Sequence, residues 1–301
     1  MSDLSGYEHI RSGGAGFYEQ KRGLIAVWGK EAVQFLDGMI TNDMKTLEDG
    51  AQMLAAFPNA QGRLVALVRV LREGDRFLFE TEDATREKVF QNLFRFTYAG
   101  DFFVEDLSES YQYIEIFGVK DALPVVEDTI TLKGDFSLDC FARPVDANAI
   151  GGHLTAAGAV TISDDLYDTL RIENGIPKYG VDMDETTIVS ELGLKDMISY
   201  TKGCYIGQEI IARIHFRGHI AKQLTGLVSS EPGAVASVLS SGAELKTTDG
   251  KNAGRITSVT YSPKLDKQIA LAFVRFDQLA ENTELFAGES KVSVKNLPFI
   301  N

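Results

Sequence analysis

Residues 202–209 read Lys-Gly-Cys-Tyr-Ile-Gly-Gln-Glu, and they combine a thiol, a cation, an amide, a carboxylate and two glycines. Apolar residues then recur at helical spacing, as at Ile210 and Ile214, so we expect a glycine loop that opens an amphipathic helix. Cys204 would lie at or just before the helix N-terminus, where unpaired N–H groups and the dipole favour negative charge. With Lys202 beside it, Cys204 is a candidate reactive thiolate or metal ligand. The alternative is a small buried apolar residue.

The bulk composition indicates a globular protein of more than one domain. Its 301 residues exceed one typical domain, and its contents of 44% hydrophobic and 24% charged residues are ordinary. Apolar runs of ~18 residues are absent, so we expect no membrane span. The first six residues lack the features of a signal peptide. Two cysteines, Cys140 and Cys204, do not make a disulfide framework. A reducing, cytoplasmic location is therefore expected.

Charge is distributed unevenly along the chain. The formal net charge is −13, and residues 101–191 hold 19 acidic and 5 basic residues. Residues 192–222, in contrast, hold 5 basic and 2 acidic residues. This basic island should attract an anion, most strongly at low salt, although a solvated helix face explains it equally. Direct binding of duplex nucleic acid is not expected, because it needs a broad basic surface.

The eight positions 202–209 resemble the signature of the YgfZ family, and the similarity extends from about Leu24 to Phe299. That family consists of folate-binding proteins related to the glycine cleavage T-protein, which support iron–sulfur enzymes and thereby tRNA methylthiolation. The resemblance implies tetrahydrofolate or a derivative as cofactor. It also implies iron–sulfur enzymes or assembly factors as partners.

The N-terminal part predicts an α+β fold with antiparallel sheets. Thr41-Asn42-Asp43, after the first expected helix, resembles the end of a T-protein helix; Asn42 or Asp43 lines a pocket or simply caps and turns the chain. We expect strands at 22–28, 53–57, 64–71, 77–79, 102–104 and 111–117, and helices at 30–40 and 83–98.

One departure from the aminomethyltransferases lies in the strand after Gly62. There the relatives carry a pair of aspartates, one of which has the key role in one-carbon transfer, but this chain has Leu64-Val65-Ala66-Leu67. Apolar side chains cannot accept a proton or stabilise an iminium-like centre. Aminomethyl transfer is therefore not expected, and whether the protein is an enzyme stays open. Arg63 is typical of the YgfZ-like branch.

Residues 118–162 carry the weakest patterns. A strand at 136–141 would place Cys140 in the core, and Gly151-Gly152-His153 indicates a turn. His153 is then a solvated loop residue rather than a ligand.

A second motif follows a helix expected at 163–174. Positions 171–182 resemble the Arg-x-Glu-x-Gly…Tyr-Gly-x-Asp motif of T-protein relatives, in which the glutamate receives the pterin ring. A carboxylate at Glu173 can accept two adjacent pterin N–H groups, and Tyr179 can cover a ring face. The anionic tail of a folate would be drawn toward Lys202 and Arg213. The alternative makes Glu173 an exposed residue that pairs with a neighbouring cation.

After Lys222 the helical periodicity stops, and about six short strands predict a small closed barrel. Residues 254–263, Gly-Arg-Ile-Thr-Ser-Val-Thr-Tyr-Ser-Pro, and the closing Leu297-Pro298-Phe299 resemble the T-protein C-terminal barrel. We therefore divide the chain into a T-protein-like folate-binding region at 1–221, with two lobes, and a barrel domain at 222–301.

Three hypotheses follow. The first is a folate-binding accessory protein for iron–sulfur enzymes with Cys204 as the functional thiol. The second is a tetrahydrofolate-dependent aminomethyltransferase or demethylase. The third is a cysteine enzyme without folate, which would need His215 or His219 as a base. One cysteine cannot hold a conventional four-thiolate cluster, and we expect no resident metal.

Overall fold

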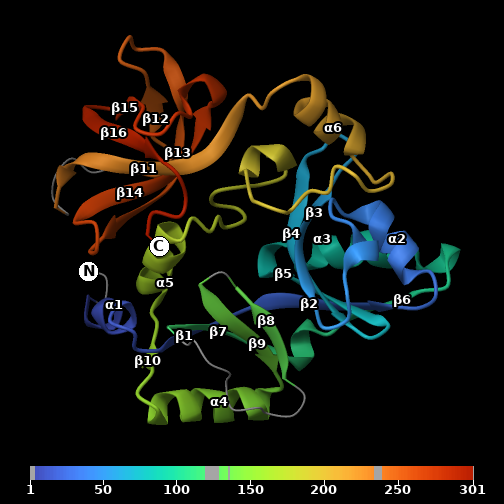
Figure 1. Cartoon of the computed structure of the whole chain (residues 1–301). Coiled ribbons are helices and arrows are strands. Elements are labelled where there is room, and N and C mark those ends of the chain that lie inside the picture. Colours follow the sequence, from blue (N-terminus) through green and yellow to red (C-terminus); the bar gives the residue numbers. More distant parts are fainter. Residues whose placement is uncertain (1–3, 119–128, 135, 234–238, 301) are drawn as a thin grey trace. The chain divides into compact units, whose positions relative to one another are not determined.

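The computed structural model describes residues 4–118, 129–134, 136–233 and 239–300 (Figure 1). The chain forms two compact units: Asp3–Ser163 with Lys195–Gln208, and Asp164–Leu194 with Glu209–Asn301. The division predicted at residue 222 stays a prediction.

The first unit contains a five-stranded antiparallel sheet in the order β3-β4-β5-β2-β6. Alternation along the central strand β2 buries both faces of the sheet. Ile25 and Val27 lie in the core shared with two helices, whereas Leu24 and Ala26 lie in a separate apolar cluster on the other face. The elements are β2 (Arg22–Trp28), α2 (Ala32–Met39), β3 (Gln52–Pro58), β4 (Leu64–Glu73), β5 (Arg76–Glu82), α3 (Asp83–Phe94) and β6 (Phe103–Asp106).

A second sheet of this unit has the order β10-β1-β7-β9-β8, antiparallel except for the β1–β10 pair. One of its faces shares the cluster of Leu24 and Ala26, and the other is covered by α4. The layers of the first unit are therefore helices, sheet, sheet and helix. The elements are α1 (Leu4–Arg11), β1 (Gly16–Gln20), β7 (Gln112–Phe117), β8 (Ile130–Lys133), β9 (Ser137–Ala142), α4 (Pro144–Ala156) and β10 (Val160–Thr161).

Two local predictions are corrected in this unit. The turn expected at Gly151–His153 is wrong, because these residues lie inside α4. Ala147, Ile150 and Leu154 bury one face of that helix against the sheet, and this packing outweighs the low helix propensity of two glycines. The helix expected to reach residue 98 ends at Phe94 and is followed by a short 3₁₀ turn.

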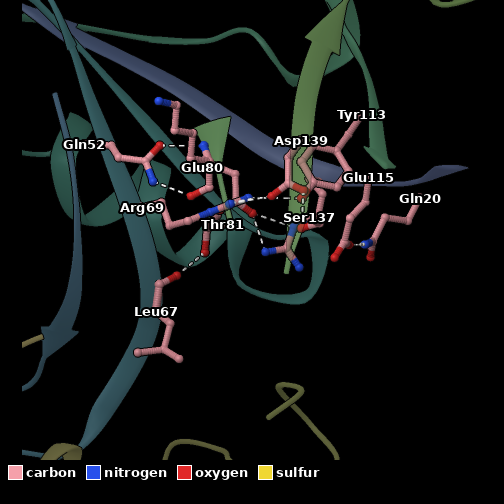
Figure 2. A network of polar contacts seen from close by, with 12 residues as sticks. Gln20, Gln52, Leu67, Arg69, Glu80, Thr81, Tyr113, Glu115, Ser137 and Asp139 are labelled. Carbon is pink, nitrogen blue, oxygen red and sulfur yellow. Dashed lines mark hydrogen bonds and ion pairs between the residues drawn. The ribbon is translucent and has the colours of Figure 1, made fainter. Parts of the chain in front are cut away.

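A buried ionic network joins the two sheets of the first unit (Figure 2). Arg69 on β4 donates to Glu80 on β5 at 2.7 Å, to the Tyr113 hydroxyl at 3.0 Å, and to Asp139 on β9. Desolvation alone would raise the pKa of Glu80, but the charges of Arg22 and Arg69 lower it overall. Burial raises the pKa of Tyr113 well above its ordinary value. A fully hydrogen-bonded network of this kind fixes how one sheet lies against the other.

The second unit contains α5 (Asp164–Glu173), most of α6 (Gln208–Arg217) and the closed barrel β11-β14-β13-β12-β15-β16. A barrel leaves no unpaired sheet edge and encloses an aliphatic core. The predicted α+β class and the C-terminal barrel are therefore confirmed. The strands are β11 (Lys222–Pro232), β12 (Glu244–Lys246), β13 (Asn252–Ser262), β14 (Lys267–Arg275), β15 (Glu284–Ala287) and β16 (Ser290–Lys295). Short 3₁₀ helices over the two units are η1 (Met44–Thr46), η2 (Thr97–Ala99), η3 (Ser108–Ser110), η4 (Val189–Leu192) and η5 (Phe276–Gln278).

Candidate functional site

Lys202 anchors the loop 202–209 to the end of α2. Its Nζ donates to the backbone oxygens of Asp37 at 2.6 Å, Ile40 at 3.1 Å and Asn42 at 2.6 Å, and lies 3.1 Å from Asp37 Oδ1. The side chain of Lys202 is 0% exposed. A cation at this position satisfies carbonyls that the helix leaves unpaired and matches the negative end of its dipole.

The ion pair beneath the loop is strongly coupled. Burial alone would raise the pKa of Asp37, but the hydrogen bond and charge of Lys202, assisted by Lys45, lower it overall. Desolvation lowers the pKa of Lys202, and Asp37 opposes that shift. Four oxygen neighbours around one ammonium explain why the pair tolerates burial.

The residues after Cys204 are also held in place. Tyr205 is buried with Lys202 Nζ 5.2 Å from its ring centroid, and burial raises its pKa to about 12. The amide of Ile206 donates to Gly38 O at 3.1 Å. Gly207 has φ 79°, and a Cβ there would lie 2.4 Å from Asn59 O, so this position requires glycine.

Cys204 itself is exposed and reduced, in contrast to Cys140. It is therefore not the buried apolar residue of the alternative interpretation. Burial raises the pKa of Cys140 to about 12, as expected for an inert thiol in the core. α6 begins at Gln208, so Cys204 precedes the helix by one loop turn rather than capping it. The loop fixes its own backbone and presents one thiol at the surface.

The segment Thr41-Asn42-Asp43 serves as a turn that meets the same loop. The Thr41 hydroxyl donates to Met197 O, the Asn42 amide donates to Leu54 O and Asp196 O, and Asp43 caps η1. Asn42 also borders an open depression of about 440 Å³ in the first unit, which is lined by Asn42, Thr46, Leu47, Glu48, Ala51, Gln52, Met53, Asp196 and Ile198.

The second motif is a self-contained polar scaffold in the second unit. Arg171 Nη1 donates to Asp182 Oδ2 at 2.9 Å, and that same oxygen accepts the Lys178 amide at 3.0 Å. Gly175 has φ 73° just past the end of α5, which is the left-handed C-terminal stop that glycine permits. The arginine, the glycine and the final aspartate of the motif thus fold the chain around Glu173.

Glu173 and Tyr179 are the motif's two predicted ligand contacts. Glu173, the last residue of α5, is 0% exposed and accepts a short hydrogen bond from the Ser262 hydroxyl. The interpretation of Glu173 as an exposed helix-end residue is therefore excluded. Tyr179 is buried, and its hydroxyl donates to Glu185 Oε2 at 3.2 Å. Burying a carboxylate is costly unless it is hydrogen-bonded, which Ser262 provides.

Arg213 differs from the other predicted residues because it is largely exposed. Its side chain is 64% exposed and pairs with Glu209 at 2.7 Å one helical turn away. The predicted residues thus fall into two sets, with Lys202 and Cys204 on one loop of the first unit. Glu173, Tyr179 and Arg213 belong to the second. That any of them contacts a ligand stays a prediction.

Sequence reasoning missed two residues that support these sets. Asp37 is the acidic interruption on the otherwise apolar face of α2, and it pairs with Lys202. Ser262 belongs to the motif 254–263, which was attributed only to the barrel. An acidic residue on an apolar helix face was the available signal for Asp37.

The strand that replaces the aspartate pair is part of the sheet core. Leu64 and Ala66 of β4 are 0% exposed, and Ala66 and Val65 pack in the cluster beneath α2 and α3. These positions therefore offer hydrocarbon where the aminomethyltransferases carry carboxylates.

Comparison with known proteins agrees with this geometry. The GCVT N-terminal domain matches residues 5–142, and the glycine cleavage T-protein C-terminal barrel domain matches residues 222–299. The chain is 24% identical to the mitochondrial iron-sulfur cluster assembly factor IBA57 homolog of Mycosarcoma maydis, over 86% of this chain and 73% of that protein. It is 27% identical to the tRNA-modifying protein YgfZ of Hamiltonella defensa, over 67% of this chain and 66% of that protein. The chain belongs to the YgfZ family.

Aminomethyltransferases are related to this YgfZ-family chain at similar identity. One from Rubrobacter xylanophilus is 26% identical over 89% of this chain and 78% of its own length. The crystal structure of aminomethyltransferase T from Bartonella henselae superposes with a TM-score of 0.85 at 19% identity, covering 99% of this chain and 89% of that one. At this identity the likeness establishes the fold alone.

Two searches of the YgfZ-family chain bear on its surroundings. No helix among the described residues is long and apolar enough to cross a membrane. Within the same residues, no group of three or more His, Cys, Asp or Glu side chains could hold a metal ion.

Proposed function

We propose that this protein is a folate-binding accessory factor that supports the assembly or repair of iron–sulfur clusters in enzymes, including enzymes that modify tRNA. The observation that carries the proposal is the presentation of Cys204: an exposed thiol on a loop whose other residues are anchored. The names of the IBA57 and YgfZ relatives support the same assignment. A cytoplasmic location is part of the proposal.

The donor set fits a folate. Glu173 supplies a buried, hydrogen-bonded carboxylate suited to the adjacent N–H groups of a pterin, and Tyr179 supplies an aromatic face. Arg213 supplies an exposed cation for the carboxylates of the tail. Lys202 already contacts four oxygens of its own unit, and an additional attraction to the tail is part of the proposal. Bound tetrahydrofolate would supply a reduced pterin ring able to carry one-carbon units.

Cys204 would act on the partner side. An exposed thiol can contact a cluster, a metal or the thiol of another protein, and a single thiolate leaves the remaining ligands to that partner. The fixed backbone around Cys204 keeps the sulfur in place without a conformational search.

Isothermal calorimetry with tetrahydrofolate tests the cofactor assignment. We expect wild type to bind and Glu173→Gln to lose about tenfold or more in affinity, because a charge-assisted pair is removed. Glu191→Gln is the matched control, since Glu191 is another buried acid of the same unit. An unchanged affinity in Glu173→Gln would refute the role of Glu173, and no binding by wild type would refute the cofactor.

The second candidate is a tetrahydrofolate-dependent aminomethyltransferase or demethylase. The fold match to aminomethyltransferase T favours it. The buried hydrocarbon at Leu64 and Ala66 opposes it, since no carboxylate stands there. Turnover of glycine-derived or N-methyl donors with tetrahydrofolate at ordinary enzymatic rates would establish this candidate instead.

A further inference from the structure

The motif 254–263 lies mostly on β13, and its hydroxyl groups face the acidic motif. A register shift between Ile256 and Ser258 interrupts the pairing of β13 with β14, after which every second residue lies on one face of the strand. That face carries Ser258, Thr260 and Ser262. Each of these three hydroxyls hydrogen-bonds a different residue of α5.

The contacts form a ladder between strand and helix within the second unit. Ser258 accepts from Arg171 Nη2 at 3.0 Å, and the hydroxyls of Thr260 and Thr169 lie 2.9 Å apart. One step further along, Ser262 donates to Glu173 Oε1. The extra residue of the shift, Thr257, donates to Asp182 Oδ1 at 2.5 Å and so binds the end of the same motif.

Ser262 has a defined hydrogen-bonding polarity. Its hydroxyl is 0% exposed and lies 3.3 Å from the Leu265 amide, which can only donate. The single hydroxyl hydrogen is therefore directed to Glu173, and an ionised carboxylate can only accept it. This contact favours the charged carboxylate and fixes its plane.

The backbone of Glu173 is held at the same end of α5. Its carbonyl accepts the Phe299 amide at 2.9 Å, and Gly175 lies against Leu297, where a Cβ would come within 2.8 Å of the leucine Cβ. Both the main chain and the side chain of Glu173 are thus set by residues of the barrel domain's motifs.

We propose that Ser262 is a positioning residue for ligand recognition by Glu173, holding the carboxylate so that its remaining acceptor sites can receive the paired N–H groups of a pterin. This inference rests on the proposed folate binding. A carboxylate offers about four lone-pair sites, so the Ser262 bond and a bidentate ligand can coexist.

The test is the affinity for tetrahydrofolate, measured by calorimetry on the full chain. Ser262→Ala is expected to weaken binding about tenfold, the usual effect of losing a hydrogen bond to a charged group. Ser258→Ala and Thr260→Val are matched controls, because they remove neighbouring hydroxyls of the same ladder that do not touch Glu173; each is expected to change affinity less than about threefold. Equal weakening by all three variants would overturn the inference.

A double variant separates positioning from structural damage. If Ser262 acts through Glu173, adding Ser262→Ala to Glu173→Gln should weaken binding no further, whereas independent effects would multiply. Multiplying effects, or a wild-type affinity in Ser262→Ala while Glu173→Gln is weakened, would overturn the inference and leave the proposed function standing. No binding by wild type would refute both.

A second substitution covers the case in which Ser262→Ala does not fold, as judged by circular dichroism and the melting temperature. Ser262→Cys keeps a similar volume and offers a weaker donor, so we expect an affinity between those of wild type and Glu173→Gln. Wild-type affinity in a folded Ser262→Cys protein would count against the inference.

Discussion

Cys204 is exposed while its neighbours in the loop 202–209 are anchored. Lys202 is fixed by oxygens at the end of α2, Tyr205 is buried, and Gly207 has a backbone conformation that only glycine adopts without strain. A surface thiol contributes little packing energy, so its substitution should separate function from stability. At the residue scale, the chemistry of the loop is concentrated in one sulfur atom.

We expect Cys204→Ala and Cys204→Ser to abolish complementation of a strain lacking this protein's function, with a melting temperature nearly equal to that of wild type. The measurements are complementation in vivo and thermal unfolding of the purified variants. Cys140→Ser is the control: it places a hydroxyl at a 0% exposed site and should lower the melting temperature. Full complementation by Cys204→Ala would remove the thiol from the mechanism.

At the scale of elements, two buried ion pairs carry the architecture of the first unit. Lys202 joins the signature loop to α2, and Arg69 joins the two sheets. Removing one member of a buried pair leaves the other charge without compensation, which costs more than the pair itself contributes. Both sites therefore predict large losses of stability without any direct change to Cys204 or Glu173.

Lys202→Met should destabilise the protein by about 3–5 kcal/mol, because the Asp37 carboxylate and three carbonyls lose their partner. Chemical denaturation measures this loss. The double variant Lys202→Met with Asp37→Leu removes both charges and should recover part of it. Equal stability of Lys202→Met and wild type would show that Lys202 does not cap α2.

Glu80 makes stability depend on acid. Its folded pKa is below the ordinary 4.5, so its ion pairs contribute fully above about pH 4.5 and are lost as pH falls through the lowered folded value. Glu80→Gln should lower stability at neutral pH and flatten its dependence on pH below 4.5. Urea unfolding across this acidic range measures both effects. A variant whose stability falls with acid as steeply as wild type would contradict the assignment.

At the scale of the whole molecule, charge is the dominant feature. The chain carries a net charge of −13, yet residues 192–222 have an excess of basic over acidic residues. Exposed cations in an acidic protein attract small anions without attracting nucleic acid over a broad surface. Arg213, whose side chain is 64% exposed, is the member of the proposed site most sensitive to salt.

Affinity for tetrahydrofolate should therefore fall as salt rises, and Arg213→Gln should weaken binding several-fold at low salt while reducing this salt dependence. Calorimetry at two ionic strengths measures both. Arg217→Gln is the control on the same helix and should have a smaller effect. If Arg213→Gln retained the salt dependence of wild type, the folate tail would bind elsewhere.

The sequence alone determined what depends on local pattern. Alternation and helical spacing predicted β2, α5, α6 and the closed barrel, because side-chain periodicity reflects which face of an element is buried. The two glycine-containing motifs identified Cys204 and Glu173 as chemically interesting. Periodicity failed at α4, where two glycines indicated a turn but the burial of Ile150 and Leu154 maintains a helix.

Only the tertiary structure decided which residues act together. Lys202 lies 165 positions from Asp37, and Ser262 lies 89 positions from Glu173, so no local pattern connects them. It also showed that Cys204 is exposed and Glu173 buried, which the residue types alone left open. The physical reason is that periodicity records the environment of each element separately, whereas a hydrogen bond between distant segments exists only after the chain has folded.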